Sequence, residues 1–122
     1  MELKVIPGEF AICKVKDLSQ INLEQEFLFL GKTNEEISLV CPACGVPQNP
    51  LCREPGWRAF RIEGVLDFSL TGILASLSSQ LAESGIGIFA ISTYNTDYIL
   101  TKKENSAKAL DALREAGYEI NE

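Results

Sequence analysis

The chain has 122 residues, which is enough for one ordinary domain or for two very small domains that share a core. Its composition, with 46% hydrophobic and 23% charged residues, is typical of a globular protein. The formal net charge of −6 comes from 17 acidic and 11 basic residues, which form no cationic stripe. Since nucleic-acid binders gain most of their affinity from cationic contacts to phosphate, we expect no nucleic-acid partner.

The first forty residues are predicted to form mostly β-sheet. Alternation around Leu3 and Val5 indicates a short strand, which Pro7 and Gly8 then interrupt. Residues 17–24 carry few apolar side chains and suit a short helix or a loop. Three apolar runs are further predicted strands, of which the last two form a hairpin: residues 10–15, 27–30 and 37–40.

Residues 41–56, CPACGVPQNPLCREPG, contain four prolines and two glycines. Proline removes a backbone donor and fixes φ, so neither a long helix nor a central strand is expected here. We interpret the segment as a structured linker or loop. It ends a first unit, residues 1–56, and leads into a second unit, residues 57–122.

The second unit is predicted to follow the order β-α-β-β-α-β. Its strands are residues 57–63, 86–91, 98–101 and 118–120, and its helices lie between Asp67 and Gly85 and over residues 104–116. This is the ferredoxin-like α+β arrangement, with four antiparallel strands and two helices on one face. One interpretation of the first unit is a degenerate copy of the second, with shortened connections in place of its helices.

The first helix of this unit carries a strong amphipathic pattern. Its apolar residues recur at helical spacing: Leu70, Ile73, Leu74, Leu77 and Leu81. Asp67 or Ser69 can cap its start, and Gly85 is placed for a left-handed stop. In the second helix, the residues expected to pack inward are Ala107, Leu110 and Leu113, and Gly117 is its expected stop.

The start of the first helix is one candidate binding site. A helix start presents free N–H groups and a positive dipole end, which favour a carboxylate or a phosphate. Gly72 in the first turn costs the helix up to about 1 kcal/mol relative to alanine. Either a ligand approaches the backbone there, or the glycine lets another strand or subunit pack closely.

The polar segment STYNTD, residues 92–97, is a second candidate. Asp97 can pair with the ammonium or guanidinium group of a ligand, and the hydroxyl groups of Ser92, Thr93 and Thr96 offer neutral hydrogen bonds. The alternative is a plain hairpin loop, because these residue types are ordinary turn formers. A helix start that favours a carboxylate, beside a loop that favours a cation, would suit a zwitterion such as an amino acid.

The four cysteines form a third candidate. The sequence Cys41-Pro-Ala-Cys44-Gly is similar to half of a zinc site, whose other ligands would have to be Cys13 and Cys52. A redox dithiol is conceivable, but such sites place the first cysteine at a helix start, whereas prolines follow here. Ordinary loop thiols are the preferred interpretation, so we expect no metal and no cofactor.

Neither catalysis nor a membrane span is expected. The chain has no histidine, which is the commonest general base and the commonest nitrogen ligand for metals. No apolar run approaches the roughly 20 residues of a membrane helix, and the start MELKVIPGEF lacks the order of a signal peptide. We therefore expect a cytoplasmic protein that is not an enzyme.

Residues 54–104 resemble the small bacterial ACT-domain proteins that consist of little more than paired ACT modules. They are also similar to part of the cytosolic arginine sensors of the animal growth-control pathway. The most specific matching segments are DFSLTGI, residues 67–73, and ISTYNTDY, residues 91–98. PGEFAICKV, residues 7–15, also fits the bacterial group, and residues 41–53 fit it least.

This resemblance implies a ferredoxin-like ACT fold whose modules pair side by side into a continuous sheet, so we expect a homodimer. It implies an amino-acid ligand bound at the joint between ACT units. The residues that would contact this ligand by similarity are Asp67, Ser69, Leu70, Thr71, Gly72, Ile73, Phe89, Ser92, Thr93, Thr96 and Asp97. In the arginine sensors, the aspartate that matches Asp97 faces the cationic end of the ligand.

Two alternatives compete with a regulatory module that binds an amino acid. In the first, the protein is a structural dimer or adaptor that buries the strand at 86–91 against a partner and binds no small ligand. In the second, it is an enzyme of the acylphosphatase type, which needs an arginine in the loop after the first strand; this loop offers Asp67 and Ser69 instead. Replacement of Asp97 separates a sensor from an adaptor, because only a sensor would lose ligand binding.

Overall fold

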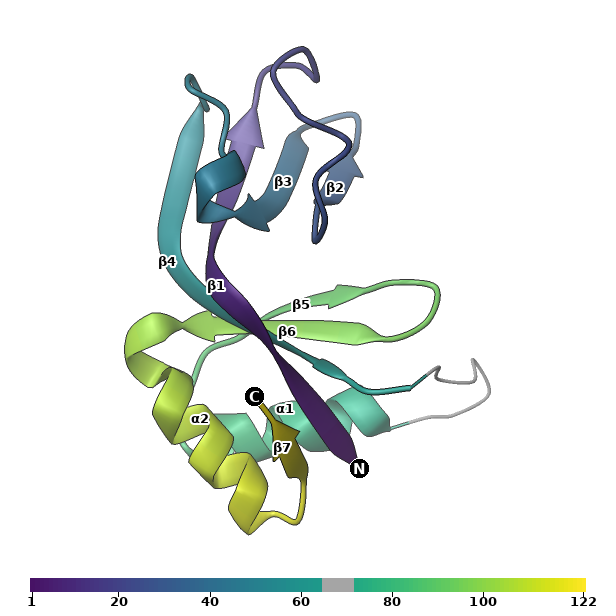
Figure 1. Ribbon diagram of the computed structural model, residues 1–122, viewed down its shortest axis with the longest axis vertical. Coiled ribbons are helices and arrows are strands. Elements are labelled where there is room, and N and C mark those ends of the chain that lie inside the picture. Colours follow the sequence, from purple (N-terminus) through teal and green to yellow (C-terminus); the bar gives the residue numbers. More distant parts are fainter. Residues whose placement is uncertain (65–71) are drawn as a thin grey trace. The chain divides into compact units, whose positions relative to one another are not determined.

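The structure is a computed structural model that describes residues 1–64 and 72–122. Its strands are β1 (Glu2–Val15), β2 (Phe29–Lys32), β3 (Ile37–Pro42), β4 (Cys52–Ile62), β5 (Phe89–Ser92), β6 (Asp97–Lys102) and β7 (Glu119–Asn121). Its helices are the short 3₁₀ helix Ala43–Gly45, α1 (Ile73–Glu83) and α2 (Lys103–Glu115) (Figure 1). The β-α-β-β-α-β order predicted for the second half is therefore confirmed.

The chain divides into two compact units. One, which we call the helical unit, contains Met1–Pro7 and Arg58–Glu122, and the other, the strand-rich unit, contains Gly8–Trp57. β1 and β4 are long strands that contribute residues to both units. The first seven residues thus belong to the unit formed by the second half of the chain. The interpretation of the other unit as a degenerate ACT copy stays a prediction.

The helical unit is a sheet with α1 and α2 on one face (Figure 1). Its strands lie in the order β7-β1-β4-β6-β5. β7 is parallel to the start of β1, with Leu3 opposite Ile120, so the prediction of four antiparallel strands is wrong in this respect. The first residues of β1 lie between β7 and β4 in this sheet.

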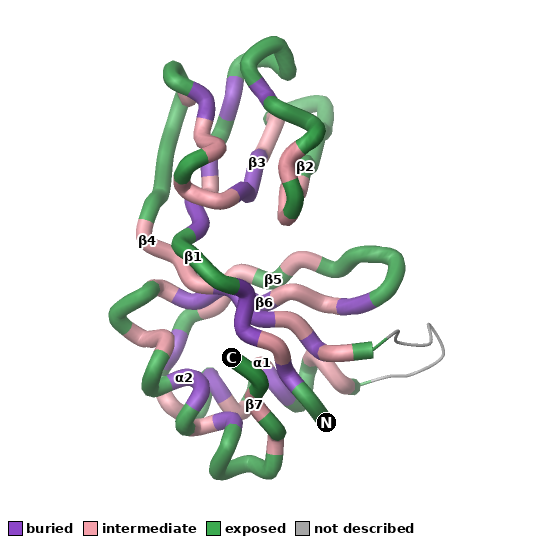
Figure 2. Tube along the Cα trace, viewed as in Figure 1, coloured by how far each residue is buried: buried purple, intermediate pink, exposed green. Residues whose placement is uncertain are grey.

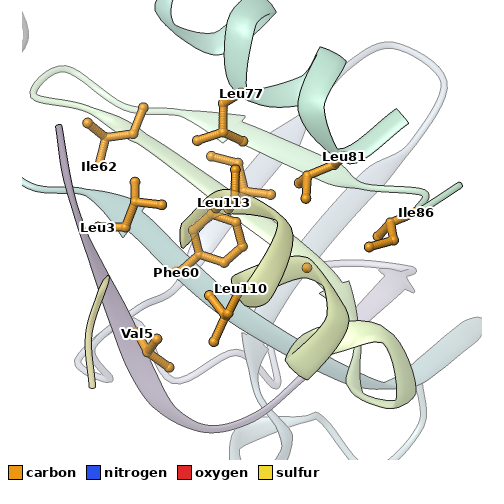
Figure 3. Packing of buried hydrophobic residues seen from close by; sticks show 11 residues of the cluster. Leu3, Val5, Phe60, Ile62, Leu77, Leu81, Ile86, Leu110 and Leu113 are labelled. Atoms are coloured by element: carbon orange, nitrogen blue, oxygen red, sulfur yellow. The ribbon is translucent and has the colours of Figure 1, made fainter. Parts of the chain in front are cut away.

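The core of the helical unit lies between the sheet and the two helices. Figure 3 shows side chains from β1, β4, α1 and α2 converging around Phe60. The buried members are Leu3, Val5, Phe60, Ile62, Leu77, Leu81, Ile86, Ile99, Ala109, Leu110 and Leu113. The inward residues of α1 agree with the helical pattern. In α2 the expected Ala107 is exposed and Ala109 is buried instead, because Leu110 and Leu113 centre the apolar stripe closer to residue 109.

Both helices end at a glycine in the left-handed conformation. At the end of α1, Gly85 has φ of 72°, its N–H donates to the carbonyl of Ala82 at 3.0 Å, and the N–H of Ile86 donates to that of Leu81 at 3.0 Å. Gly117 ends α2 with the same pair of bonds. This is the Schellman motif, which satisfies the last carbonyls of a helix. The predicted stops at Gly85 and Gly117 are confirmed.

The start of α1 differs from the prediction. Its N-cap is Gly72, with φ of 80° and no side-chain cap, and the proposed caps Asp67 and Ser69 lie outside the described residues, as does Leu70. An added Cβ on Gly72 would meet no described atom within 4 Å. The positive φ therefore accounts for glycine there, without close packing against any described residue.

The strand-rich unit corrects two expectations. β1 continues through Pro7 and Gly8, because Gly8 adopts φ of 88° without ending the strand. β4 begins at Cys52, so residues 52–56, expected in a loop, are strand. Within this unit the strand order is β2-β3-β1-β4, and an edge strand such as β4 tolerates Pro55.

A second, smaller core holds the strand-rich unit together. Figure 2 shows buried residues along β1 and β3, and largely exposed ones along β2 and the start of β4. The buried cluster consists of Ala11, Cys13, Val15, Ile21, Leu39 and Cys41. The predicted hairpin is present, with its first strand at Phe29–Lys32 instead of 27–30, and Leu30 lies opposite Leu39.

Candidate functional site

A pocket of about 260 Å³ lies between the end of β4 and the hairpin that joins β5 to β6. We call it the hairpin pocket; its lining residues are Arg61, Ile62, Glu63, Gly64, Thr93, Asn95, Thr96 and Tyr98. The two parts of the lining meet because β4 and β6 are neighbours in the sheet. Alternation along β4 turns Arg61 and Glu63 away from Phe60 and Ile62, which face the core.

Thr96 joins the hairpin to β4. The N–H of Glu63 donates to the carbonyl of Glu2 on β1 at 2.9 Å, so the backbone groups of Ile62, one residue earlier, point the other way, toward β6. There the Thr96 hydroxyl donates to the carbonyl of Ile62 at 2.7 Å. Thr96 is 8% exposed and Ile62 is fully buried. A side chain thus supplies a hydrogen bond at the point where β6 has not yet begun.

The hairpin turn is closed by Thr93. Its N–H and its hydroxyl both donate to the carbonyl of Thr96, at 2.8 Å and 2.9 Å, and its hydroxyl oxygen accepts from the N–H of Thr96 at 3.3 Å. Both threonine hydroxyl protons therefore serve the local fold. Only the oxygen lone pairs of these side chains remain for a ligand.

The charged groups of the hairpin pocket are connected through Arg61. Its Nε donates to Oε1 of Glu63 at 3.2 Å, and its Nη1 donates to the Tyr98 hydroxyl at 3.1 Å. The guanidinium carbon also lies 5.9 Å from the centroid of the Tyr98 ring. The bond to Tyr98, and to a smaller extent the bond to Glu63, raises the pKa of Arg61, so its charge is secure. With side chains 32% and 31% exposed, Arg61 and Glu63 remain accessible to a ligand.

The sequence did not identify Arg61, Glu63 and Tyr98 as site residues, and it included Asn95 only as part of the candidate segment 92–97. Alternation along residues 57–63 places Arg61 and Glu63 on one strand face, and two opposite charges at the end of a strand were the available signal. The bond between Tyr98 and Arg61 could not be predicted from the sequence, because it depends on which strand lies beside β4. Arg61 and Tyr98 are 37 residues apart in the sequence.

The structure does not bring all of the predicted ligand contacts together. Thr93 and Thr96 line the hairpin pocket. Ser92 and Asp97 lie opposite each other at the ends of β5 and β6, where the Ser92 hydroxyl donates to Oδ1 of Asp97 at 2.5 Å, and neither lines this pocket. Phe89 lies at the other end of β5. The predicted contacts outside the described residues are Asp67, Ser69, Leu70 and Thr71.

Gly72 and Ile73 line a different pocket of about 340 Å³, at the start of α1. Its other lining residues are Met1, Ser76, Gln80, Ala116, Gly117 and Tyr118. None of the described lining side chains is charged. This second pocket offers a helix start and neutral polar groups, whereas the hairpin pocket combines both signs of charge.

The four cysteines are free thiols. Cys13 and Cys41 are buried in the strand-rich unit, while Cys44 and Cys52 are exposed. Burial raises the pKa of Cys41 to about 11, and it also raises that of Cys13, although the nearby Arg53 acts in the opposite direction. Zinc is bound by thiolates. In residues 1–64 and 72–122 no group of three ligating side chains is placed to hold a metal.

A model of the ACT domain matches residues 53–115, which include β4 from its second residue, α1, β5, β6 and α2. The chain belongs to the ACT-domain family. The predicted α+β ACT fold is thereby confirmed, and ACT domains are regulatory modules without catalytic activity. No helix in the described part of this ACT protein is long and apolar enough to cross a membrane.

Solved structures with the same fold extend beyond the matched segment. A protein from Agobacterium tumefaciens is 31% identical, with a TM-score of 0.86 over 98% of this chain and 90% of its own. A Vibrio cholerae protein of unknown function, described as a possible transport protein, is 24% identical, with a TM-score of 0.73 over 93% and 88%. The regulatory subunit of aspartate kinase from Thermus thermophilus, in its ligand-free form, is 12% identical, with a TM-score of 0.65 over 94% and 96%. Comparison with curated proteins found no match.

Proposed function

We propose that this ACT protein is a non-catalytic regulatory module that binds a free amino acid in the hairpin pocket. The observation that carries the proposal is the lining of this pocket, where a guanidinium, a carboxylate and neutral polar groups surround one cavity. An amino acid carries one charge of each sign on adjacent groups, so it is the small molecule that this arrangement suits best. Membership in a family of regulatory modules supports the proposal.

The absence of catalysis rests on the chemistry of the side chains. The chain contains no histidine, and the Thr93 and Thr96 hydroxyl groups donate to backbone carbonyls instead of to a base. An activated nucleophile needs such a base. Ligand binding would therefore act on a partner or on self-association.

Asp97 remains a predicted ligand contact in this proposal. Its Oδ1 accepts the hydroxyl of Ser92, and its other carboxylate oxygen has no partner in the part of the chain that the structure describes. The predicted contacts at residues 67, 69, 70 and 71 also stay predictions. Together they would place the ligand near the hairpin and the segment that follows β4.

A homodimer is a second part of the proposal. Among the described strands β5 has one neighbour, β6, so its other edge is open to a strand from a second copy. Side-by-side pairing there would continue the sheet. Ala90 is exposed on β5, and a lysine on an edge strand opposes pairing. We expect Ala90→Lys to be monomeric in size-exclusion chromatography with light scattering. The control Ala82→Lys, on the exposed surface of α1, should keep the mass of the wild type. Equal masses for the wild type and Ala90→Lys would contradict pairing through β5.

The proposed location is the cytoplasm. A reducing compartment suits four free cysteines, two of which are exposed. Fractionation of cells that produce the tagged protein would test this part of the proposal.

The experiment that tests amino-acid binding is a thermal-unfolding scan against each of the twenty amino acids. A ligand present at 100 times its Kd stabilises the fold by about 2.7 kcal/mol, which corresponds to a rise of the midpoint on the order of 10 °C. The scan is repeated with Arg61→Gln, with Asp97→Ala and with Arg114→Gln. Arg114 is the matched control, because it pairs with Asp111 and Glu122 at the surface of α2, away from the pocket lining.

We expect a shift with at least one amino acid in the wild type and in Arg114→Gln, and a smaller shift in Arg61→Gln. A shift that is lost in Asp97→Ala would assign that residue to the ligand as well. If the folded protein responds to no amino acid, the structural adaptor becomes the better interpretation. A shift that Arg61→Gln leaves unchanged would move the ligand to another site.

A further inference from the structure

We infer that the hairpin pocket selects amino acids with a neutral polar side chain, and that Arg61 and Glu63 bind their carboxylate and ammonium groups. This inference rests on the proposed function and names the class of ligand. It follows from counting which hydrogen-bonding groups of the pocket are already used within the fold, and which remain for a ligand.

Arg61 has the donors that a carboxylate needs. A guanidinium carries five N–H groups, of which one on Nε and one on Nη1 are used by Glu63 and Tyr98. The remaining three, one on Nη1 and two on Nη2, have no partner within residues 1–64 and 72–122. Each terminal nitrogen therefore retains a donor, and a carboxylate accepts two such bonds at once. Because two neighbours already hold the side chain, little of its rotamer freedom is lost on binding.

Glu63 supplies the acceptor for the ammonium group. Its Oε1 accepts from Arg61, while no residue in the described part of the chain donates to its Oε2. A carboxylate accepts more than one hydrogen bond on each oxygen. Arg61 and Glu63, on the same face where β4 ends, thus present a cation and an anion side by side, and an α-amino acid carries its own two charges on adjacent groups.

The rest of the lining then faces the side chain of the ligand. Thr93 and Thr96 retain only acceptor lone pairs, since their protons serve the backbone, and the exposed Asn95 offers both a donor and an acceptor. Among the described lining residues, Arg61 and Glu63 are the charged ones. A charged ligand side chain would find no counter-charge among these residues. A neutral polar side chain can form hydrogen bonds with Asn95 and with the lone pairs of Thr93 and Thr96, which an aliphatic one cannot.

This conclusion differs from a ligand with a cationic end, which the resemblance to the arginine sensors suggests. In that view Asp97 receives the cationic end of the ligand. Asp97 instead accepts the hydroxyl of Ser92 at 2.5 Å and lies outside the lining of the hairpin pocket. Serine, threonine, asparagine and glutamine are the ligands that the lining predicts.

Isothermal titration of the purified full chain provides the test. The probes are the four neutral polar amino acids, the charged arginine, lysine, aspartate and glutamate, and the aliphatic valine and leucine. We expect the tightest neutral polar amino acid to bind at least about tenfold more tightly than any member of the other two groups. A charged or aliphatic amino acid as the tightest ligand would overturn the selectivity and leave the proposed function standing, whereas no binding by any probe to the folded protein would overturn both.

The roles of Arg61 and Glu63 are tested with analogues of the tightest ligand. Conversion of its carboxylate to a carboxamide should weaken binding to the wild type by roughly tenfold or more, because charge-assisted bonds are lost. In Arg61→Gln the same conversion should have little further effect, while Arg114→Gln should respond as the wild type does. N-acetylation of the ligand, which removes the charge of its ammonium group, should likewise weaken binding to the wild type and have little further effect in Glu63→Gln.

Arg61→Lys keeps the charge and serves if Arg61→Gln fails to fold. A lysine cannot make the two-point bond, so its affinity should fall between those of the wild type and Arg61→Gln. If the carboxamide weakens binding equally in the wild type and in the Arg61 variants, Arg61 does not bind the carboxylate and the assignment is wrong.

Discussion

Replacement of Thr96 by valine tests how the hairpin is attached to the sheet. Valine has nearly the same shape as threonine but lacks the hydroxyl that donates to the Ile62 carbonyl at 2.7 Å. That carbonyl belongs to a fully buried residue and would lose this donor. An unsatisfied buried acceptor costs about 1–3 kcal/mol, so we expect the free energy of unfolding to fall by about 2 kcal/mol.

Urea denaturation measures this loss. With an m value of about 2 kcal/mol/M, the midpoint should fall by about 1 M, and the slope should not change. Thr96→Ser, which retains the hydroxyl, should lose less stability than Thr96→Val. Thr93→Val is a matched control, because the hydroxyl of this exposed residue bonds within the turn, where water can replace it. Equal midpoints for the wild type and Thr96→Val would refute the claim that this hydroxyl completes the sheet.

Three further predictions concern the helices and the thiols. Gly117→Ala should cost about 1–2 kcal/mol in the free energy of unfolding, measured in urea, because φ is 100° there; a neutral result would mean that the helix end relaxes. Leu113→Ala should cost about 2–5 kcal/mol in the same assay, since Leu113 is fully buried, whereas Leu23→Ala at a 62% exposed site should cost far less. The pKa of Cys41 is raised to about 11 from its ordinary value of 9.0, which means that the native state retains the thiol proton to higher pH than the unfolded state does. Stability should therefore decline between pH 9.0 and about 11, and Cys41→Ala should decline less; parallel pH profiles would contradict this.

The exposure of the cysteines can be checked in the same samples. Iodoacetamide applied to the native protein should modify Cys44 and Cys52, which are exposed, and spare Cys13 and Cys41, which are buried. Mass spectrometry of peptides identifies the modified sites. Rapid modification of Cys41 at neutral pH would show that the strand-rich unit opens readily.

Local signals in the sequence determined the helices, their glycine stops and both hairpins of this protein. These features are readable because they depend on residues within a few positions of one another. The helical spacing of Leu77 and Leu81 and the placement of Gly85 and Gly117 needed no knowledge of the rest of the chain. The resemblance carried by residues 54–104 added the family, which the match over 53–115 bears out.

The predictions failed where pairing with neighbouring strands determines whether a segment is part of a strand. Proline in 41–56 indicated a loop, but Cys52–Gly56 forms a strand because Pro55 lies where β4 is an edge. Pro7 and Gly8 indicated a break, yet β1 is continuous. Its residues 10–15, after these two positions, pair with β3, and its residues 2–4, before them, pair with β7. These outcomes depend on partners that are distant in the sequence.

The sequence by itself thus determined the order of the elements in the second half of the chain, while the tertiary structure alone decided which strands are neighbours. Only strand pairing places residues 2–4 beside β7, and only the contact of β4 with β6 brings Arg61 to Tyr98 and Thr96 to Ile62. The physical reason is that helix and turn preferences act over a few residues, whereas sheet contacts and pockets join segments tens of residues apart. The pairing of charges in the hairpin pocket belongs to this second kind.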